Sequence, residues 1–409
     1  WVFLVGLLLF TGFVAGADPA LYISSFRPLK ILQSRTRLGK GGPLATGLLG
    51  FQFTISVLAI VSGIIFSMNA IFQEALDLGY ARKELIVVDL QPKDFTSYYE
   101  AIVQDPRIVS AAGTQEHIGY GWYLRTIEDE DQELEVNVMD VGPRYLETMG
   151  LTVQDGRVFH PDREEGDRGV SIVVNQMMVD VFGWENPVGR QVRMDDTIQY
   201  RIIGVVKDFY SQGMWSKIEP MMMKLPPEDS YRTMAVRASN SDLPGVLDYL
   251  RETWVKMIPN YPFDGMYQED TLEEEKAINR SIKQLYIFLA IAATLLSMIG
   301  LYTLVSLSIL NRTKEIGIRK VMGSPVPRIW LVLSKGFLIN LAISSVIGCI
   351  GGYYLSLMML DSIWDYWLDF NAGIYIYSVL IILVATAATI TGKVYQAALQ
   401  NPVTCLRYE

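Results

Sequence analysis

Residues 284–309 read QLYIFLAIAATLLSMIGLYTLVSLSI, a stretch without a single charged side chain. A helix that crosses a membrane needs about 20 predominantly apolar residues. Four further apolar stretches lie at residues 1–17, 46–70, 334–359 and 373–396. Buried helices of a soluble protein average only about 11–12 residues, which makes them the weaker interpretation. The sequence therefore predicts an α-helical membrane bundle with five spans in this chain.

The loops between these spans differ in charge, and the difference predicts their orientation. The loop between the first two spans has basic residues with no acid among them, namely Arg27, Lys30, Arg35, Arg37 and Lys40. The loop between the third and fourth spans is also basic, with Arg312, Lys314, Arg319, Lys320 and Arg328 against Glu315 alone. The loop between the fourth and fifth spans has Asp361, Asp365 and Asp369 and no base. Since lysine and arginine accumulate on the cytoplasmic side, we expect both basic loops and the C-terminus in the cytoplasm.

An acidic block separates the second and third spans. Residues 71–280 hold 21 Lys and Arg against 38 Asp and Glu, a net charge of −17, whereas the rest of the chain carries +8. Half of the 409 residues are hydrophobic and only 19% are charged, which excludes a uniformly soluble enzyme and a disordered chain. A nucleic-acid binder would show a broad basic face, so we expect no nucleic-acid partner. The block is predicted to lie outside, on the same side as the 360–372 loop.

The acidic block has the pattern of an α+β region, either one sizeable domain or two small ones. Segment 133–139 alternates apolar and polar residues with the period of two that a half-buried strand shows. Further strands are expected at 84–90, 108–114, 170–174 and 200–206, and helices at 95–104, 176–182 and 241–257. A last helix begins at 270–276, where Thr271 and Glu274 fit a capping box, and no breaker follows before Gly300. The predicted fold class is a membrane bundle with a large α+β outside domain on helical stalks.

The sequence contains no complete motif for a cofactor. A phosphate-binding P-loop needs Gly-x4-Gly-Lys followed by Ser or Thr, and neither Gly-Lys pair, at 39–40 or at 392–393, has that next residue. We therefore expect no cofactor on this chain; if ATP drives the protein, ATP and Mg²⁺ bind to another polypeptide. His117 and His160 lack the spacing of zinc ligands, so no metal site is predicted.

The remaining candidates for chemistry are weaker. Cys349 and Cys405 are too few for a disulfide framework, and we expect two reduced thiols. The acidic runs 128–131 and 160–165 fit neither a calcium loop nor a zinc site and are interpreted as solvated surface. Paired carboxylates for hydrolysis stay open, because any two of the 38 acids could converge.

The most informative segment is 311–324, NRTKEIGIRKVMGS. A signal for orientation alone needs only lysine and arginine, which leaves Ile316, Ile318 and Val321 unexplained. The run 329–333 is also amphipathic. A short interfacial helix that docks a partner accounts for both observations.

Arg312 to Gly323 resembles the R-x-K-E-I-G-I-R-K-x-x-G signature of FtsX-like permeases, the type VII membrane subunits of ABC transporters that include the MacB-like proteins. Gly150 followed by Gly156-Arg157-Val158-Phe159 is similar to the G-x5-G-R-x-F of the MacB-like periplasmic core domain. Further segments that resemble the family lie at 16–28, 173–175, 186–190, 203–209 and 401–409. The resemblance covers essentially the whole chain.

The resemblance implies a permease that couples ATP hydrolysis by a separate ATPase to movement of its periplasmic domain, in mechanotransmission, export or efflux. The residues that match the ATPase-coupling signature are Arg312, Lys314, Glu315, Gly317, Arg319, Lys320 and Gly323. The implied partners are a dimeric ABC ATPase, a preceding permease repeat or a second permease, the lipid bilayer, and a periplasmic adaptor or outer-membrane channel. The implied location is the bacterial inner membrane, with residues 71–283 in the periplasm and the C-terminus in the cytoplasm.

The start of the chain predicts an internal repeat. The sequence begins at Trp1 and not at Met, and residues 1–17 lack the basic region of a signal peptide. Pro28-Leu29 after the first span matches Pro402-Val403 after the last. We therefore expect the C-terminal repeat of a two-repeat, eight-span member. The expected domains are 1–17, the last helix of a preceding repeat; 18–45, a basic cytoplasmic linker; 46–70, a transmembrane helix and stalk start; 71–283, the periplasmic core domain and stalk; and 284–409, three transmembrane helices with a cytoplasmic coupling loop at 310–333 and a C-terminal tail.

Small residues in the spans suit close helix packing, namely Gly12, Gly16, Gly348 and Gly352. Lys335 is interpreted as a side chain that extends to the cytoplasmic surface, with a functional charge as the alternative. A membrane-anchored periplasmic sensor or scaffold without transport is the alternative function, and a periplasmic hydrolase is the third. The sequence does not choose a substrate among peptides, antibiotics, lipoproteins and cell-wall regulation.

Overall fold

The computed structural model describes residues 5–6, 43–90, 95–130, 132–195, 198–213, 215–226, 230–239 and 242–399. The predicted first span at 1–17, the linker at 18–45 and the tail beyond 399 lie wholly or almost wholly outside these residues. Gly12, Gly16 and Cys405 lie outside them as well.

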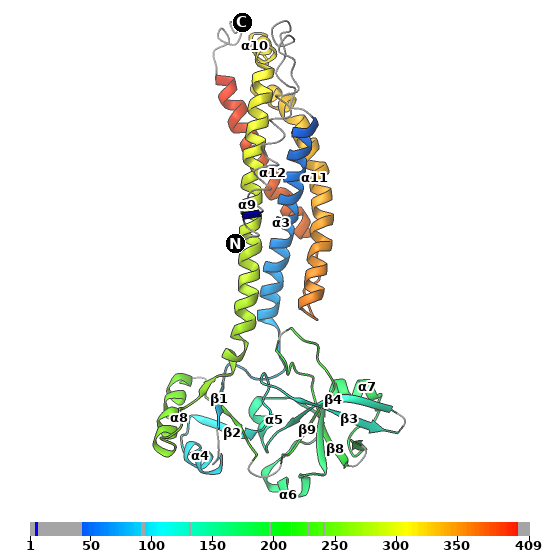
Figure 1. The fold of residues 1–409 in the computed structure, drawn as a ribbon, viewed down its shortest axis with the longest axis vertical. Coiled ribbons are helices and arrows are strands. Elements are labelled where there is room, and N and C mark those ends of the chain that lie inside the picture. Colours follow the sequence, from blue (N-terminus) through cyan, green and yellow to red (C-terminus); the bar gives the residue numbers. More distant parts are fainter. Residues whose placement is uncertain are drawn as a thin grey trace. The chain divides into compact units, whose positions relative to one another are not determined.

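Four helices in the described part of the chain are long and apolar enough to cross a membrane. They are α3 (Pro43–Ala75), α9 (Glu273–Asn311), α11 (Val326–Ile363) and α12 (Ala372–Leu399) (Figure 1). Four of the five predicted apolar helices are thereby confirmed. Each observed helix is longer than its apolar window, because amphipathic turns continue the helix at one or both ends.

The start of α9 differs from the prediction. Residues Gln268–Leu272 form a short 3-10 helix, η2, directly before Glu273. Thr271 therefore lies inside η2 and is not the N-cap of α9, so the predicted capping box with Glu274 does not form. Its hydroxyl donates to the carbonyl oxygen of Gln268 at 2.7 Å. The predicted continuity is confirmed, since one helix runs from Glu273 to Asn311.

The chain divides into two compact units, of which the first holds residues 1–58, 290–350 and 375–409. In this unit the early turns of α3 make polar contacts with α9 and α11. Ser56 and Ser297 share a hydrogen bond of 2.7 Å between their hydroxyl oxygens, and Ser344 donates to the Gly50 carbonyl oxygen at 2.9 Å. Polar contacts of this kind help apolar helices to recognise one another in a bilayer.

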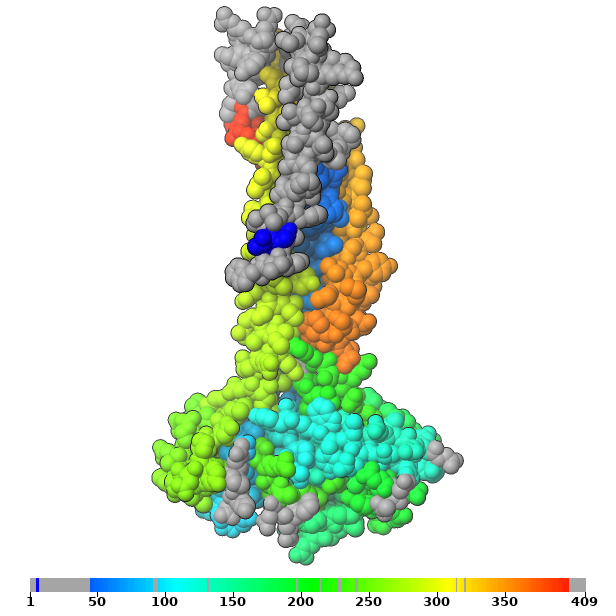
Figure 2. All heavy atoms as spheres, in the orientation of Figure 1, coloured from blue at the N-terminus to red at the C-terminus, as the bar shows by residue number. Residues whose placement is uncertain are grey.

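Helix α9 is the most exposed of the four apolar helices, whereas α3 is the most enclosed. The atoms of α9 are yellow-green in Figure 2, where they form part of the outer surface. Leu295, Leu296 and Ile299 are among its large exposed apolar side chains. Surface of this composition suits contact with lipid or with another apolar helix.

The second unit holds residues 59–289 and 351–374 and contains two sheets. The first sheet is antiparallel, in the order β11 (Gly265–Tyr267), β1 (Leu85–Asp89), β10 (Thr233–Ala238), β2 (Ile108–Thr114). Helices α4 (Phe95–Ile102) and α8 (Leu243–Met257) pack against it. Their buried side chains include Tyr98, Leu250 and Trp254, and the Tyr98 hydroxyl donates to the Leu250 carbonyl oxygen at 2.8 Å.

The second sheet closes on itself. Its order is β5 (Val153–Gly156), β8 (Ile198–Val206), β6 (Ser171–Asn175), β9 (Met221–Lys224), β4 (Gln132–Asp140), β3 (Tyr123–Asp129), β7 (Gln191–Met194). Strand β7 pairs with β8 as well as with β3, which makes a small barrel. Helix α7 (Gln176–Phe182) follows β6, with Asn175 as its N-cap and Gly183 as its left-handed C-cap. The predicted helix at 176–182 is therefore confirmed.

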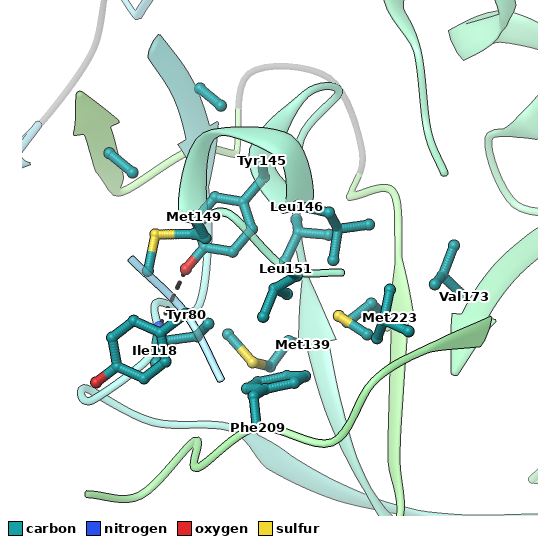
Figure 3. Packing of buried hydrophobic residues seen from close by; sticks show 14 of the residues in the cluster. Tyr80, Ile118, Met139, Tyr145, Leu146, Met149, Leu151, Val173, Phe209 and Met223 are labelled. Carbon is teal, nitrogen blue, oxygen red and sulfur yellow. Dashed lines mark hydrogen bonds between the residues drawn. The ribbon is translucent and has the colours of Figure 1, made fainter. Parts of the chain in front are cut away.

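A shared hydrophobic core joins the two sheets into one domain. It combines Leu85 and Ala235 of the first sheet with Met139, Val173 and Met223 of the second. The short helix α5 (Tyr145–Met149) supplies further side chains to the same core (Figure 3). The short helices η1 (Pro161–Arg163) and α6 (Glu164–Asp167) precede β6. Of the two organisations left open by the sequence, the structure has one sizeable α+β domain.

The segment predicted as a loop at 310–333 is mostly helical. It contains α10 (Thr313–Val321) and the first turns of α11, which begins at Val326. The expectation of a short helix is confirmed for residues 313–321, but the amphipathic run 329–333 belongs to α11. Pro327 is compatible with this start, because a residue in the first turn of a helix donates no hydrogen bond within the helix.

Candidate functional site

Helix α10 follows α9 almost without interruption. Arg312 separates the two helices; its backbone N–H donates to the Ile309 carbonyl oxygen, and its own carbonyl accepts from Ile316 N at 2.9 Å. The Thr313 hydroxyl donates to the carbonyl oxygens of Ile309 and Leu310 at 3.0 Å. These bonds tie the first turn of α10 to the last turn of α9.

The other end of α10 is a tight turn centred on Gly323. Its φ of +78° lies in the left-handed region, which favours glycine. Ser324 N donates to the Arg319 carbonyl oxygen at 2.9 Å, and Met322 N donates to that of Ile318 at 3.0 Å. The predicted residue Gly323 thus ends α10 and begins the turn toward α11.

Helix α10 has one face against α11 and one face in the open. Ile316 and Gly317 are buried, and Ile316 lines a shallow depression together with Ile329 and Leu333 of α11. The exposed fractions of Ile318, Val321 and Met322 are 54%, 67% and 81%. Apolar residues are rarely left this open in a run of basic residues unless another surface covers them.

Charged side chains border the same depression. Glu315 and Arg319 form an ion pair with 2.6 Å between Oε1 and Nη2, one helical turn apart. Arg312 lines the depression with them. The structure therefore brings together Arg312, Glu315 and Arg319 of the predicted residues, while the side chains of Lys314 and Lys320 lie outside its described part.

Two of the predicted packing glycines, Gly348 and Gly352, lie in the described part of the chain. A Cβ atom on Gly348 would lie 2.8 Å from the Thr54 carbonyl oxygen and 2.8 Å from Val57 Cβ, so α11 and α3 approach closely there. Gly352 is buried. The close approach supports a packing role for Gly348.

The sequence did not reveal a buried hydrogen-bonded ring in the periplasmic-type domain. Ile118 N–H donates to the Tyr145 hydroxyl oxygen at 3.1 Å, and that oxygen lies 2.9 Å from His117 Nδ1. His117 Nε2 lies 2.6 Å from Gln268 Oε1, and Gln268 Nε2 donates to the Ile118 carbonyl oxygen at 3.1 Å. We call these four residues the His117 ring; Figure 3 shows its bond between Ile118 and Tyr145.

The geometry of the His117 ring assigns every proton in it. Gln268 Oε1 can only accept, so His117 Nε2 carries the imidazole proton. Nδ1 is then an acceptor, and the Tyr145 hydroxyl donates to it. Burial lowers the pKa of His117 to about 4, with the Gln268 bond opposing the shift, and burial raises the pKa of Tyr145 well above its usual range.

The His117 ring fastens the root of α9 to the domain. Gln268 belongs to η2, directly before α9, whereas His117 follows β2 and Tyr145 belongs to α5. The three residues are far apart in the sequence, and no local spacing connects them. The only signal in the sequence was a polar residue just before a long helix, and Gln268 does not stand out from the other polar residues there.

The described part of the second unit has two open clefts that could bind a ligand. One of about 660 Å³ is lined by residues that include Glu116, Tyr120 and Arg232. The other, of about 1000 Å³, contains Arg157 and Asp167, and the hydrogen bond from Arg157 lowers the pKa of that carboxyl. A carboxylate held in its ionised form is the opposite of what a general acid requires. Within the described ranges no three His, Cys, Asp or Glu side chains are close enough to hold a metal ion.

Comparison with known protein families identifies both halves of the chain. Residues 46–253, just over half of the 409, match the MacB-like periplasmic core domain, and residues 287–402 match the FtsX-like permease C-terminal domain. The chain therefore belongs to the MacB/FtsX-like family of ABC transporter permeases. The four apolar helices in the described part of the chain and the periplasmic α+β domain fit a protein of the inner membrane.

Curated relatives include macrolide export ATP-binding/permease proteins named MacB. The one from Aggregatibacter actinomycetemcomitans is 24% identical over 228 residues, covering 54% of this chain and 35% of the relative. The one from Mannheimia succiniciproducens is 22% identical over 286 residues, covering 67% and 43%. The one from Bartonella henselae is 25% identical over 299 residues, covering 69% and 44%. The chain thus spans less than half the length of these relatives.

Similar solved structures include the periplasmic region of MacB from Actinobacillus actinomycetemcomitans, with a TM-score of 0.36, 17% identity, and coverage of 47% of this chain and 92% of that one. The extracellular domain of the noncanonic ABC-type transporter YknZ from Gram-positive bacteria has a TM-score of 0.35 and 13% identity, with 44% and 99% covered.

Proposed function

We propose that this chain is the membrane subunit through which a separate ATPase moves the periplasmic domain. The observation that carries the proposal is the open face of α10, where Ile318 and Val321, and Met322 directly after the helix, stand exposed beside basic residues. Such a face suits a partner with an apolar groove and acidic neighbours. Because α9 leads into α10 with one residue between them, displacement of α10 would act directly on α9.

The family relationship supports the direction of the coupling. The curated relatives are named as both ATP-binding and permease proteins, and the sequence of this chain has no P-loop. We propose that ATP and Mg²⁺ bind to a partner ATPase dimer on the cytoplasmic side, where α10 and the C-terminus also lie. Export or efflux is the proposed outcome, and a macrolide is the first compound to test, because the relatives are named for macrolide export.

The open apolar surface of α9 supports two further parts of the proposal. We propose that a second permease, or a preceding permease repeat, covers part of this surface and that lipid covers the rest. A periplasmic adaptor or an outer-membrane channel would then receive the cargo from the periplasmic domain.

Charge reversal on α10 tests the docking assignment. We expect Glu315→Arg and Arg319→Glu each to reduce co-purification of the ATPase and to lower its stimulated turnover. Glu185→Arg is the matched control, because Glu185 is exposed in the other compact unit. If both reversals leave co-purification and turnover intact, the docking assignment is wrong.

The double swap Glu315→Arg with Arg319→Glu separates docking from helix stability. It restores an ion pair one turn apart within α10 but presents the opposite charges to a partner. We expect the swap to remain defective in ATPase binding. Full rescue by the swap would show that the pair only stabilises α10.

A further inference from the structure

The loop between α11 and α12 contacts the periplasmic domain within the second unit. Asp365 N–H donates to the Trp215 carbonyl oxygen at 3.0 Å. Lys217 N–H donates to Asp365 Oδ2 at 2.9 Å, and Lys217 Nζ lies 3.6 Å from Asp365 Oδ1. Trp215 and Lys217 lie between β8 and β9, so a loop of the periplasmic domain is bonded to a loop between two apolar helices.

Aromatic rings extend this contact on both sides of the ion pair. Trp215 and Trp364 meet edge to face, with 6.2 Å between ring centroids and 74° between planes. Tyr210 and Tyr366 meet in the same way, at 5.8 Å and 82°. Edge-to-face pairs at these distances are attractive, because the positive edge of one ring faces the negative face of the other.

The same α11–α12 loop is held on its other side by α3. Gln73 Nε2 donates to the Tyr366 carbonyl oxygen at 2.6 Å, and Leu368 N–H donates to Asn69 Oδ1 at 3.3 Å. Gln73 and Asn69 are both buried. Polar side chains that are buried and bonded in this way keep a loop in one position.

Helix α9 also joins this cluster, through Tyr286. Phe66 of α3 stacks on Tyr286 of α9 with 4.3 Å between ring centroids, and it lies 6.1 Å from Trp364. The α11–α12 loop is therefore in contact with α3, and Phe66 of α3 connects it to α9.

From these contacts we infer that Tyr210, Trp215 and Lys217 on one side and Trp364, Asp365 and Tyr366 on the other form a latch. The latch is a third attachment of the periplasmic domain, in addition to its covalent connections through α3 and α9. It rests on the proposed function, and it makes α11 and α12 partners in moving the domain. Two covalent connections alone would leave the domain free to pivot about them, whereas a third attachment removes that freedom.

The latch stays closed during the ATP cycle. Backbone hydrogen bonds, an ion pair and two aromatic pairs would all have to break together for it to open. Its six residues act by position only; they touch no substrate or nucleotide in this proposal.

A distance measurement tests the latch in the full chain with its ATPase partner in membranes. Spin labels are placed by Glu252→Cys on α8 and Asp361→Cys near the end of α11, both exposed, after Cys349 and Cys405 are replaced by serine. We expect one narrow distance distribution that is the same without nucleotide and with ATP trapped. The variant Trp215→Ala with Asp365→Ala is expected to lose that single narrow distribution.

The control variant Tyr261→Ala with Asp369→Ala removes the same kinds of side chain outside the latch. Both control residues are exposed, and Asp369 lies in the same loop as Asp365. We expect the control to keep the narrow distribution. If the Trp215 and Asp365 variant keeps it too, there is no functional latch.

Cross-linking tests whether the latch stays closed. Lys217→Cys with Asp365→Cys should form a disulfide readily, and the oxidised protein should hydrolyse ATP and export as well as the reduced one. If oxidation abolishes coupling and a reductant restores it, the latch must open and the inference is overturned. The nucleotide-free distance distribution does not depend on ATPase docking, so failure of the proposed function would be seen separately, as loss of ATPase co-purification by the unmodified chain.

Discussion

The imidazole of His117 is held in one protonation state by its surroundings. Both ring nitrogens are bonded, Nε2 as donor to Gln268 and Nδ1 as acceptor from Tyr145. A proton added at Nδ1 would face the Tyr145 hydroxyl, which then could not donate to it. Burial also disfavours the protonated imidazole, because its charge would lie away from water. The loss of the Tyr145 hydrogen bond and the burial therefore both lower the pKa of His117.

This arrangement predicts how stability depends on pH. An unfolded histidine has a pKa of about 6.5, whereas that of folded His117 is about 4. Between these values the unfolded state binds more protons, so the free energy of unfolding falls as the pH drops from about 6.5 to about 4 and is fully retained above that window. Titration of His117 across the whole window lowers the free energy of unfolding by about 3 kcal/mol.

Thermal unfolding of the full chain in detergent between pH 7.5 and pH 4.5 measures this effect. Other groups titrate as well, so the comparison is between variants: His117→Gln should lower the midpoint at pH 7.5 and show a shallower decline toward acid. His160→Gln is the control, because the His160 side chain is only partly buried, with 41% of it exposed, and it should behave like the unmodified chain. Equal slopes for all three proteins would contradict the assignment of a neutral, buried His117.

Single residues also show which features of the structure could be predicted from the sequence. Asn175 and Gly183 are the N-cap and the C-cap of α7, and both residue types are local signals that a sequence displays directly. The His117 ring depends on residues from three separate parts of the chain. Its bonds form only once the two sheets share a core, and no pattern along the chain encodes that meeting.

At the scale of elements, the junction of α10 and α11 decides how the exposed face of α10 is presented. The turn depends on the left-handed backbone at Gly323. A side chain with a Cβ atom in this conformation costs roughly 1–2 kcal/mol. The surrounding space is open, so the cost is backbone strain and not a steric clash.

Gly323→Ala should therefore leave the protein folded but weaken its binding to the ATPase. Relaxation of the turn would redirect α10 and separate Ile318 and Val321 from the partner surface. Gly336→Ala in α11 is the matched control, because it has open space around it and lies within a helix. ATPase affinity measured by pull-down with increasing salt should fall for the first variant only; a similar affinity for both would show that the turn does not orient α10.

The elements themselves were predictable to different degrees. Windows with no charged residue, or with Lys335 alone, located four apolar helices, because lipid or a buried interface tolerates few charges over such a length. They did not locate the ends of α11, since its first turns at 326–333 are amphipathic and look like a loop in the sequence. The closure of the second sheet by β7 and β8 was not predicted, because pairing between strands depends on register and not on local composition.

At the scale of the whole molecule, the proposed coupling depends on α9 remaining one helix. It runs from the His117 ring at Gln268, through η2, to α10 at Thr313. Along the chain, α9 therefore begins beside the His117 ring, which holds it to the periplasmic domain, and ends beside α10, the proposed docking site of the ATPase. A helix transmits displacement along its axis only while its hydrogen bonds are continuous.

A proline in α9 tests this requirement without touching either end. Ser281 is exposed, and its hydroxyl donates to the Ala277 carbonyl oxygen at 2.8 Å. Ser281→Pro removes a backbone donor and kinks or breaks the helix at a cost of about 3 kcal/mol, whereas Ser281→Ala removes only the hydroxyl. We expect the proline variant to bind the ATPase normally, because α10 is unchanged, but to hydrolyse ATP without export. Export that persists in the proline variant, at the level of the alanine control, would mean that the periplasmic domain is moved by another route, and the latch would be the first place to look for it.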